Sequence, residues 1–212
     1  MEAIIESRVF VLKGGTTSCT LGRVKGIAEE RPEMNVNNQR VRALVKIKKL
    51  HEDAVIPQYA REMDAGFDLV AVEDTLIAPG ASAKIPTGLA FALPEGYELQ
   101  VRPRSGIGAK TKLRLSNAPG TVDAGYRGEV CVLIDNIRTA SGERGYTCLD
   151  AGGKSVEVSV EVDKHSYLIR KGDRIAQGVI AQVPLAVFEV VDELDETERG
   201  SGGFGSSGIQ GL

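Results

Sequence analysis

Short apolar stretches recur along this chain between turns marked by glycine and proline, and long helical periodicity is missing. Turns at intervals of about 8–12 residues are typical of an antiparallel sandwich or barrel. The pattern therefore predicts an all-β fold, with at most a short helical turn around residues 108–113. The expected strands are 41–50, 67–72, 76–79, 83–85, 89–93, 97–101, 129–134, 168–169, 175–183 and 186–191.

Two segments fall outside this regular pattern. Residues 1–40 form an N-terminal extension of unknown role before a β domain over residues 41–198. Within that domain, residues 138–163 read as a surface insertion, because residues 155–162 alternate strictly between valine and a polar residue. Such alternation predicts a strand with one solvated face, paired as a hairpin with residues 145–149. A surface hairpin is the simpler interpretation, and a partner-binding strand edge is the functional one.

Composition narrows the possible functions. With 212 residues, 42% hydrophobic and 26% charged, the chain is long enough for one domain with a real core. A net charge of −3 argues against direct binding of nucleic acid through a broad basic surface. The sequence contains neither an apolar run of membrane-spanning length nor a secretory signal at its start. We therefore expect a cytoplasmic protein, in a bacterium or a phage-infected cell.

Cysteine and histidine do not form a metal-binding pattern. Cys19, Cys131 and Cys148 are an odd set without metal-ligand spacing, and reduced thiols are their expected state. His51 and His165 lie far apart and near no cysteine pair. A zinc site held by protein ligands is therefore not expected.

The C-terminal segment, residues 199–212, is rich in glycine and serine, which is typical of a flexible tail. It nevertheless carries Arg199 and Phe204 with four small residues between them. An arginine can grip a polyphosphate and an aromatic ring can cover a flat base. The segment is therefore either a linker or a lid over an anionic ligand.

Two clusters of polar residues lie in the first half of the β domain. The segment 64–69 reads as a turn entering a strand, but in a phosphate site Asp68 would face inward and hold a metal-bound water or orient an arginine. In the basic loop 102–110, Ser105 followed by glycines resembles an anion-binding nest of backbone N–H groups. The spacing of a P-loop is absent there.

Two further clusters follow in the second half. Residues 117–128 read as a hairpin around a Pro-Gly pair, whose backbone groups could imitate a base-pairing partner. Within it, Asp123 follows apolar Val122 and would be a usable general base if desolvated. Tyr126 offers a flat surface for a sugar. In the fourth cluster, Gln177 could point an amide donor at a phosphate.

Each cluster alone has an ordinary structural explanation. In this order, and together with Arg199 and Phe204, they closely resemble the five ordered motifs of the trimeric deoxyuridine triphosphate nucleotidohydrolases (dUTPases). The resemblance runs from about residue 45 to residue 208 and is interrupted by the insertion. It implies a β jelly roll (β-clip) that forms a homotrimer, with a C-terminal arm exchanged between subunits. It also implies hydrolysis of dUTP to dUMP and pyrophosphate, which keeps uracil out of DNA and supplies dUMP for thymidylate synthesis.

The resemblance assigns a role to each motif residue. Asp123 would activate the water that attacks the α-phosphorus, and Mg²⁺ would be held mainly by triphosphate oxygens, with Asp68 reaching it through water. The remaining substrate contacts implied are Arg104, Ser105, Gly106 and Gln177 to phosphates, Asn117, Thr121, Val122 and the Asp123 backbone to uracil, Tyr126 to deoxyribose, Arg199 to the γ-phosphate, and Phe204 with Gly205 over the base.

Two alternatives stay open at this point. A deoxycytidine triphosphate deaminase of the same fold needs an acid–base glutamate, but Leu133 stands at that position; Asp135, two residues further on the same strand face, keeps this alternative open. The second alternative is a nucleotide-gated regulatory protein that acts through the insertion 138–163. Substituting Asp123→Asn would separate it from an enzyme, because turnover would be lost and partner binding kept.

Overall fold

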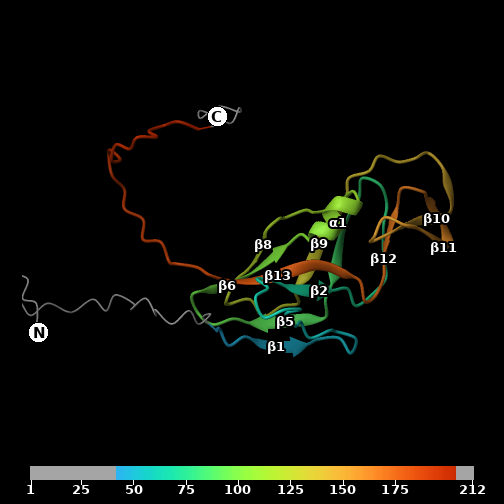
Figure 1. The fold of residues 1–212 in the computed structure, drawn as a ribbon, viewed down its shortest axis with the longest axis horizontal. Coiled ribbons are helices and arrows are strands. Elements are labelled where there is room, and N and C mark those ends of the chain that lie inside the picture. Colours follow the sequence, from blue (N-terminus) through green and yellow to red (C-terminus); the bar gives the residue numbers. More distant parts are fainter. Residues whose placement is uncertain (1–41, 204–212) are drawn as a thin grey trace, which may run out of the picture. The chain divides into compact units, whose positions relative to one another are not determined.

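Small β-sheets and one short helix make up the part of the chain that the structure describes (Figure 1). The computed structural model describes residues 42–203, and of these, residues 43–203 belong to one compact unit. Because almost every element is a strand, the structure confirms the all-β class that the spacing of apolar stretches predicts.

One four-stranded antiparallel sheet carries most of the candidate site, and its strand order is β2-β13-β6-β8. These strands are β2 (Phe67–Val70), β13 (Arg174–Gln182), β6 (Tyr97–Arg102) and β8 (Gly120–Val122). The register places Gln177 between Asp68 on one side and Arg102 on the other. Polar side chains from three strands therefore lie in one row across the sheet.

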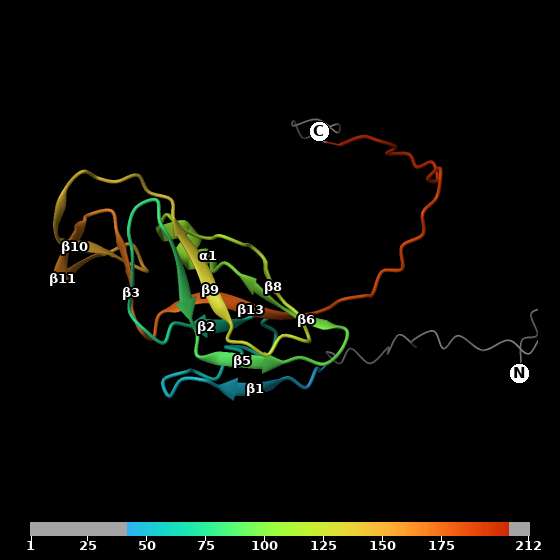
Figure 2. The same ribbon diagram turned by 180° about the vertical axis from the view of Figure 1, so that it is seen from behind.

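Two further sheets complete the framework around the core. Their orders are β4-β9-β7 and β1-β5, and β1 and β5 lie side by side in Figure 2. The elements are β1 (Lys46–Lys49), β4 (Ser82–Pro86), β5 (Leu89–Ala92), α1 (Ser105–Lys110), β7 (Leu113–Leu115) and β9 (Cys131–Asn136). In the described part of the chain, no helix has the length and apolar character needed to cross a membrane.

A fourth sheet has the strand order β11-β10-β12-β3. Its strands β10 and β11 come from the insertion. The strands are β3 (Thr75–Ile77), β10 (Arg144–Asp150), β11 (Ser155–Asp163) and β12 (Tyr167–Ile169). The antiparallel pairing of β10 with β11 confirms the predicted hairpin, with a register shift between Gly145 and Thr147. The hairpin leaves β11 at the edge of its sheet.

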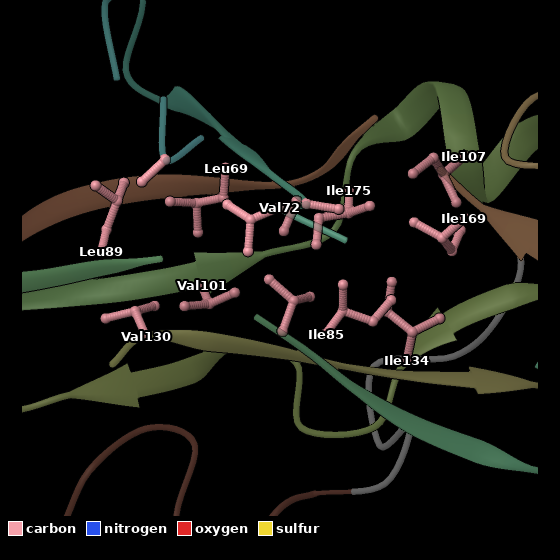
Figure 3. Packing of buried hydrophobic residues seen from close by; sticks show 14 of the residues in the cluster. Leu69, Val72, Ile85, Leu89, Val101, Ile107, Val130, Ile134, Ile169 and Ile175 are labelled. Carbon is pink, nitrogen blue, oxygen red and sulfur yellow. The ribbon is translucent and has the colours of Figure 1, made fainter. Parts of the chain in front are cut away.

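The core is filled by aliphatic side chains that the alternating pattern places on the inner faces of the strands (Figure 3). In β6, Leu99 and Val101 are buried, and in β9 the same holds for Val132 and Ile134. Each fully buried side chain of this kind stabilises the fold by about 1.5–3 kcal/mol relative to an exposed one. Because successive side chains of a strand point to opposite faces, the same alternation also decides which side chains lie on the outer face and can contact a ligand.

Several predicted elements are corrected by the structure. The helix begins at Ser105, three residues before the expected turn at 108–113, and residues 186–191 form no strand. The Pro-Gly pair makes no hairpin: β7 before it pairs with β9, whereas β8, which begins at the glycine of the pair, pairs with β6. Strands as short as β7 and β8 carry too few residues for alternation to be recognised.

Two of the three cysteines can be placed. Cys131 and Cys148 are free thiols, and desolvation by burial raises the pKa of both. Since the thiolate is the reactive form, both are poorly suited to nucleophilic chemistry. Cys19 lies outside the described residues.

Candidate active site

The outer face of the β2-β13-β6-β8 sheet is polar because its strands alternate. In β2, buried Phe67 and Leu69 flank half-buried Asp68, which therefore points to the opposite face. Gln177 lies beside Asp68 on the neighbouring strand, and Arg102 lies beside Gln177 on the next. At the far side of the sheet, Thr121 of β8 pairs with Gln100 of β6. Side chains separated by more than a hundred residues are thus brought together by register alone.

Asp68 binds two arginines at the end of this row. Its Oδ1 lies 2.8 Å from Arg104 Nε, and its Oδ2 lies 3.2 Å from Arg174 Nη1. Arg104 also donates from Nη1 to the backbone carbonyl of Arg174, at 3.1 Å. Asp68 therefore orients arginines, which is one of the two roles that the sequence suggested for it.

The loop after β6 presents its polar groups to solvent next to these arginines. Arg104 is the N-cap of α1, and Ser105 and Gly106 are exposed at the helix start. The Gln177 side chain ties the loop to the sheet, because its Nε2 donates to the carbonyl of Pro103 at 2.9 Å. One amide N–H of Gln177 is thus used within the protein, and no residue in the described part of the chain accepts from the second.

An open groove runs along this polar face. It is lined by Gln100, Arg102, Pro103, Ala118, Pro119 and Gln177. The groove joins the loop that carries Arg104 to the loop that carries Asn117. It therefore connects the second, third and fourth clusters that the sequence singled out.

The third cluster ends in a tight turn that is held by its own residues. The Tyr126 N–H donates to the carbonyl of Asp123 at 3.0 Å, and the Tyr126 hydroxyl donates to the carbonyl of Glu129 at 3.1 Å. Arg127 Nη1 donates to the carbonyls of Ala124 and Tyr126. These hydrogen bonds fix the backbone from which the Asp123 side chain projects, although the turn itself is exposed.

The structure does not bring every predicted site residue to the sheet face. Asp123, Asn117 and Tyr126 are exposed, and within residues 42–203 no hydrogen bond or ion pair engages the Asp123 carboxylate. The desolvation that the sequence suggested for Asp123 is therefore not supplied by this single chain. Arg199 is exposed and donates from Nε to the carbonyl of Gly202. Phe204 and Gly205 lie outside the described residues.

Asp68 is the carboxylate of the site that has room for a further polar contact. Among residues 42–203, no group of three or more histidine, cysteine, aspartate or glutamate side chains is placed to hold an ion. Both oxygens of Asp68 already accept from arginines, and a carboxylate keeps further lone pairs for a water molecule. These residues fit an indirect contact to a hydrated cation.

Asp135, the residue that kept the deaminase alternative open, is held by two serines. Its Oδ1 accepts from the Ser116 hydroxyl at 2.5 Å and from the Ser82 hydroxyl at 2.6 Å. These two hydrogen bonds, from Ser116 and then Ser82, lower the pKa of Asp135. A carboxylate held ionised by two donors is poorly suited to shuttle protons, and Leu133 carries no ionisable group at all.

The same arrangement predicts a pH effect on stability. Because the pKa of Asp135 is lower in the folded chain than in the unfolded one, its contribution is present at neutral pH and is lost as the pH falls through the folded pKa. Asp135→Asn should therefore flatten the acid side of the stability profile. Urea midpoints of both proteins at about pH 7 and about pH 3 measure this difference. Equal loss of stability on acidification in both proteins would contradict it.

Sequence reasoning gave no role to Arg174 or Arg127. Arg174 lies directly after the Gly-Asp turn in the fourth cluster, and a register shift between Arg174 and Ala176 turns its side chain toward Asp68. Such a bulge leaves no signature in the sequence. Arg127 follows Tyr126 directly. Its position inside the turn is the one feature of the sequence that could have indicated its hydrogen bonds to the turn carbonyls.

Comparisons with known proteins agree with this geometry. The family model described as dUTPase matches residues 52–141 and 145–208. The deoxyuridine 5'-triphosphate nucleotidohydrolase of Wolinella succinogenes is 44% identical over 164 residues, which cover 77% of this chain and 93% of that protein.

Solved structures give the same result. The dUTPase of Staphylococcus bacteriophage 80alpha, in complex with dUpNHpp, superposes with a TM-score of 0.73 at 32% identity, covering 78% of this chain and 99% of that one. A mutant dUTPase of phage phi11 of S. aureus, which coordinates a structural Mg(II) ion, has a TM-score of 0.68 at 31% identity and covers 71% and 97%.

Proposed function

Because this chain belongs to the dUTPase family, we propose that it hydrolyses dUTP to dUMP and pyrophosphate. The observation that carries the proposal is the convergence of Asp68, Arg104 and Gln177 beside an open groove. These residues come from three separate motifs and are joined by contacts that orient their donors. The reaction removes dUTP, which keeps uracil out of DNA, and supplies dUMP for thymidylate synthesis.

In the proposed site, cationic and amide donors bind the triphosphate. Arg104 is pre-oriented by Asp68, so little side-chain freedom is lost when it meets an anionic oxygen. Ser105, the backbone N–H of Gly106 and the free amide N–H of Gln177 add neutral donors. Arg199 of the C-terminal segment binds the γ-phosphate, and Phe204 with Gly205 covers the base.

The chemical step needs a base and a well-placed water. Asp123 accepts a proton from the water, which attacks the α-phosphorus in line while pyrophosphate leaves. Most of the acceleration comes from positioning and charge stabilisation. Bound Mg²⁺ would screen the charge of the phosphate oxygens that hold it, and Asp68 could contact one of its waters. The structural Mg(II) ion of the phi11 relative supports Mg²⁺ as a metal of this family.

The loop before and within β8 reads the nucleoside. Asn117 and the backbone of Thr121, Val122 and Asp123 face the uracil ring, where a methyl group at position 5 would clash. Tyr126 packs on the deoxyribose and leaves no room for a 2′-hydroxyl. The complex of the 80alpha relative with dUpNHpp supports a deoxyuridine nucleotide as the ligand.

The same proposal includes a homotrimer with an exchanged C-terminal arm. After β13, the chain exposes a series of large apolar side chains: Leu185 (94%), Val187 (92%), Phe188 (92%) and Val190 (99%). Burying each of them would contribute about 1.5–3 kcal/mol, which an isolated chain forgoes. A neighbouring copy of the chain is the natural partner for such a segment, and it would also bring Arg199 to a site that is built on another subunit.

This arrangement predicts that Phe188→Asp weakens the trimer, because a charge would replace a ring that is buried between subunits. The molar mass from light scattering should fall from three chains toward one at micromolar concentration. Glu189→Gln, at the next exposed position, serves as the control and should keep the trimer. An unchanged mass for Phe188→Asp would rule out this arm as an intersubunit contact.

A protein partner at the insertion is a second candidate, and one observation favours it. Tyr146 is 64% exposed on β10 and Val160 is 56% exposed on β11, which is an edge strand. Exposed apolar residues on an unpaired edge are typical of a binding surface. Such a partner would add regulation to catalysis and would leave the active site unaltered.

This second candidate predicts that Val160→Asp abolishes capture of a partner protein from the source cells and leaves dUTP turnover unchanged. Asp123→Asn should show the reverse pattern, since it lies outside the insertion. A captured protein that persists with Val160→Asp would exclude the β11 edge as its docking site.

A cytoplasmic location, in a bacterium or a phage-infected cell, completes the proposal and is supported by the bacterial and phage sources of the relatives. The direct test of the function is pyrophosphate release from dUTP, dCTP, dTTP and UTP in parallel with Mg²⁺. Turnover of dUTP alone is expected. Ammonia release from dCTP, or no turnover of any of the four, would overturn the assignment.

A further inference from the structure

The tip of the β10–β11 hairpin is a rigid turn. The Asp150 carboxylate accepts from the N–H groups of Gly152 and Lys154, both at 2.8 Å. The backbone adds two more bonds, from Asp150 N–H to the carbonyl of Lys154 and from Gly153 N–H to the carbonyl of Asp150. Four internal hydrogen bonds therefore hold this turn in one conformation.

This tip presses against the C-terminal end of α1. A Cβ atom built on Gly153 would lie 2.6 Å from the carbonyl oxygen of Lys110, the last residue of the helix. Real Cβ atoms essentially never approach a backbone oxygen so closely, so only glycine fits without displacing one of the two segments. Gly153 also has φ +80°, a conformation that glycine adopts without strain.

The same end of α1 is anchored at two further points. The hydroxyl of Thr111 donates to the carbonyl of Ile107 at 2.7 Å and accepts from the N–H of Leu113. The N–H of Lys112 donates to the hydroxyl of Tyr167, a fully buried side chain on β12, the strand that follows the insertion. The helix end is thus fixed by the core on one side and by the insertion on the other.

The opposite end of α1 carries the proposed phosphate contacts. The helix has six residues, which corresponds to a length of about 9 Å. Arg104 is its N-cap, and Ser105 and Gly106 form its first turn. Because Lys110 and Ser105 are the two ends of one six-residue helix, we expect a displacement at Lys110 to shift Ser105 as well.

We propose that Gly153, at the tip of the insertion, is a positioning residue that sets the placement of α1 and thereby the affinity of the site for the triphosphate. This inference rests on the proposed function, because it takes Arg104 and Ser105 as phosphate contacts. It gives the insertion a role in substrate binding that is separate from any partner at the β11 edge.

The test compares Gly153→Ala with a matched control in the same insertion. Gly142→Ala carries the same backbone strain, since Gly142 has φ +75°, but its added Cβ meets nothing within 4 Å. The measurements are the inhibition constants of dUpNHpp and of deoxyuridine, together with kcat/KM for dUTP. Gly153→Ala should weaken dUpNHpp and lower kcat/KM by about tenfold, because part of an ångström of misplacement is costly. Deoxyuridine, which lacks phosphates, should bind unchanged.

A second variant keeps the test informative if Gly153→Ala fails to fold. Asp150→Ala loosens the turn without placing an atom near Lys110, and it should weaken dUpNHpp about threefold with no effect on deoxyuridine. Equal weakening of both ligands, or no change in dUpNHpp affinity in any folded variant, would overturn the inference. If the unaltered chain binds dUpNHpp but does not turn over dUTP, the proposed hydrolysis fails, and calorimetric titration of the variants with dUpNHpp still decides the inference. If the unaltered chain does not bind dUpNHpp at all, both are overturned.

Discussion

Asp123→Asn should lower kcat for dUTP hydrolysis by about 10²–10⁴-fold, which is the usual contribution of a general base. The amide has nearly the shape of the carboxylate but cannot accept the proton of the attacking water. The turn that holds this residue uses the backbone carbonyl of Asp123 and the side chains of Tyr126 and Arg127, so its geometry should survive the substitution. The affinity for dUpNHpp should therefore change by less than about threefold.

Steady-state kinetics and calorimetric titration of dUpNHpp measure these two quantities. Glu95→Gln is the matched control, because Glu95 is an exposed acid in the turn between β5 and β6 and should keep full activity. A variant Asp123→Asn with near-normal kcat would show that another group activates the water.

Asp68→Ala is expected to lower kcat/KM for dUTP by about tenfold to a hundredfold. The loss corresponds to about 1.4–2.7 kcal/mol, which is the scale of a hydrogen bond to a charged group. Without the carboxylate, Arg104 and Arg174 repel each other, and Arg104 loses the orientation that the proposed phosphate contact needs. Because the effect acts on binding, KM should rise more than kcat falls.

Asp68→Asn separates orientation from charge. The amide oxygen can still accept from Arg104 Nε, so this variant should lie between Asp68→Ala and the unaltered chain. Glu73→Ala, which removes an exposed acid shortly after β2, should leave both kinetic constants unchanged. If Asp68→Ala changed only the urea midpoint and neither kcat nor KM, Asp68 would be a structural residue and nothing more.

The sequence predicts the framework well where strands are long enough to alternate. The inner and outer faces of β2, β6 and β9 follow directly from their apolar residues, and strict alternation also predicted the β10–β11 hairpin. Residues 186–191 show the limit of the same signal. Their apolar side chains indicate that the segment is to be buried, but the pattern does not distinguish burial within the same chain from burial against another copy of it. In this chain they remain exposed, and an expected strand is absent.

The sequence proposes the individual residues of the candidate site but not their arrangement. The ordered motifs singled out Asp68, Arg104 and Gln177, whereas their contacts depend on sheet register. The pair of Asp68 and Arg174 depends in addition on a bulge in β13, which no local pattern announces. The approach of Gly153 to Lys110 likewise joins two segments that are adjacent only in the folded chain.

Isotope transfer during hydrolysis tests the central claim most directly. The unaltered chain is incubated with dUTP and Mg²⁺ in water enriched in the heavy oxygen isotope, and the masses of both products are measured by mass spectrometry. Attack of water on the α-phosphorus places one heavy oxygen in dUMP and none in pyrophosphate. Label in pyrophosphate, or the absence of turnover, would contradict the proposed reaction.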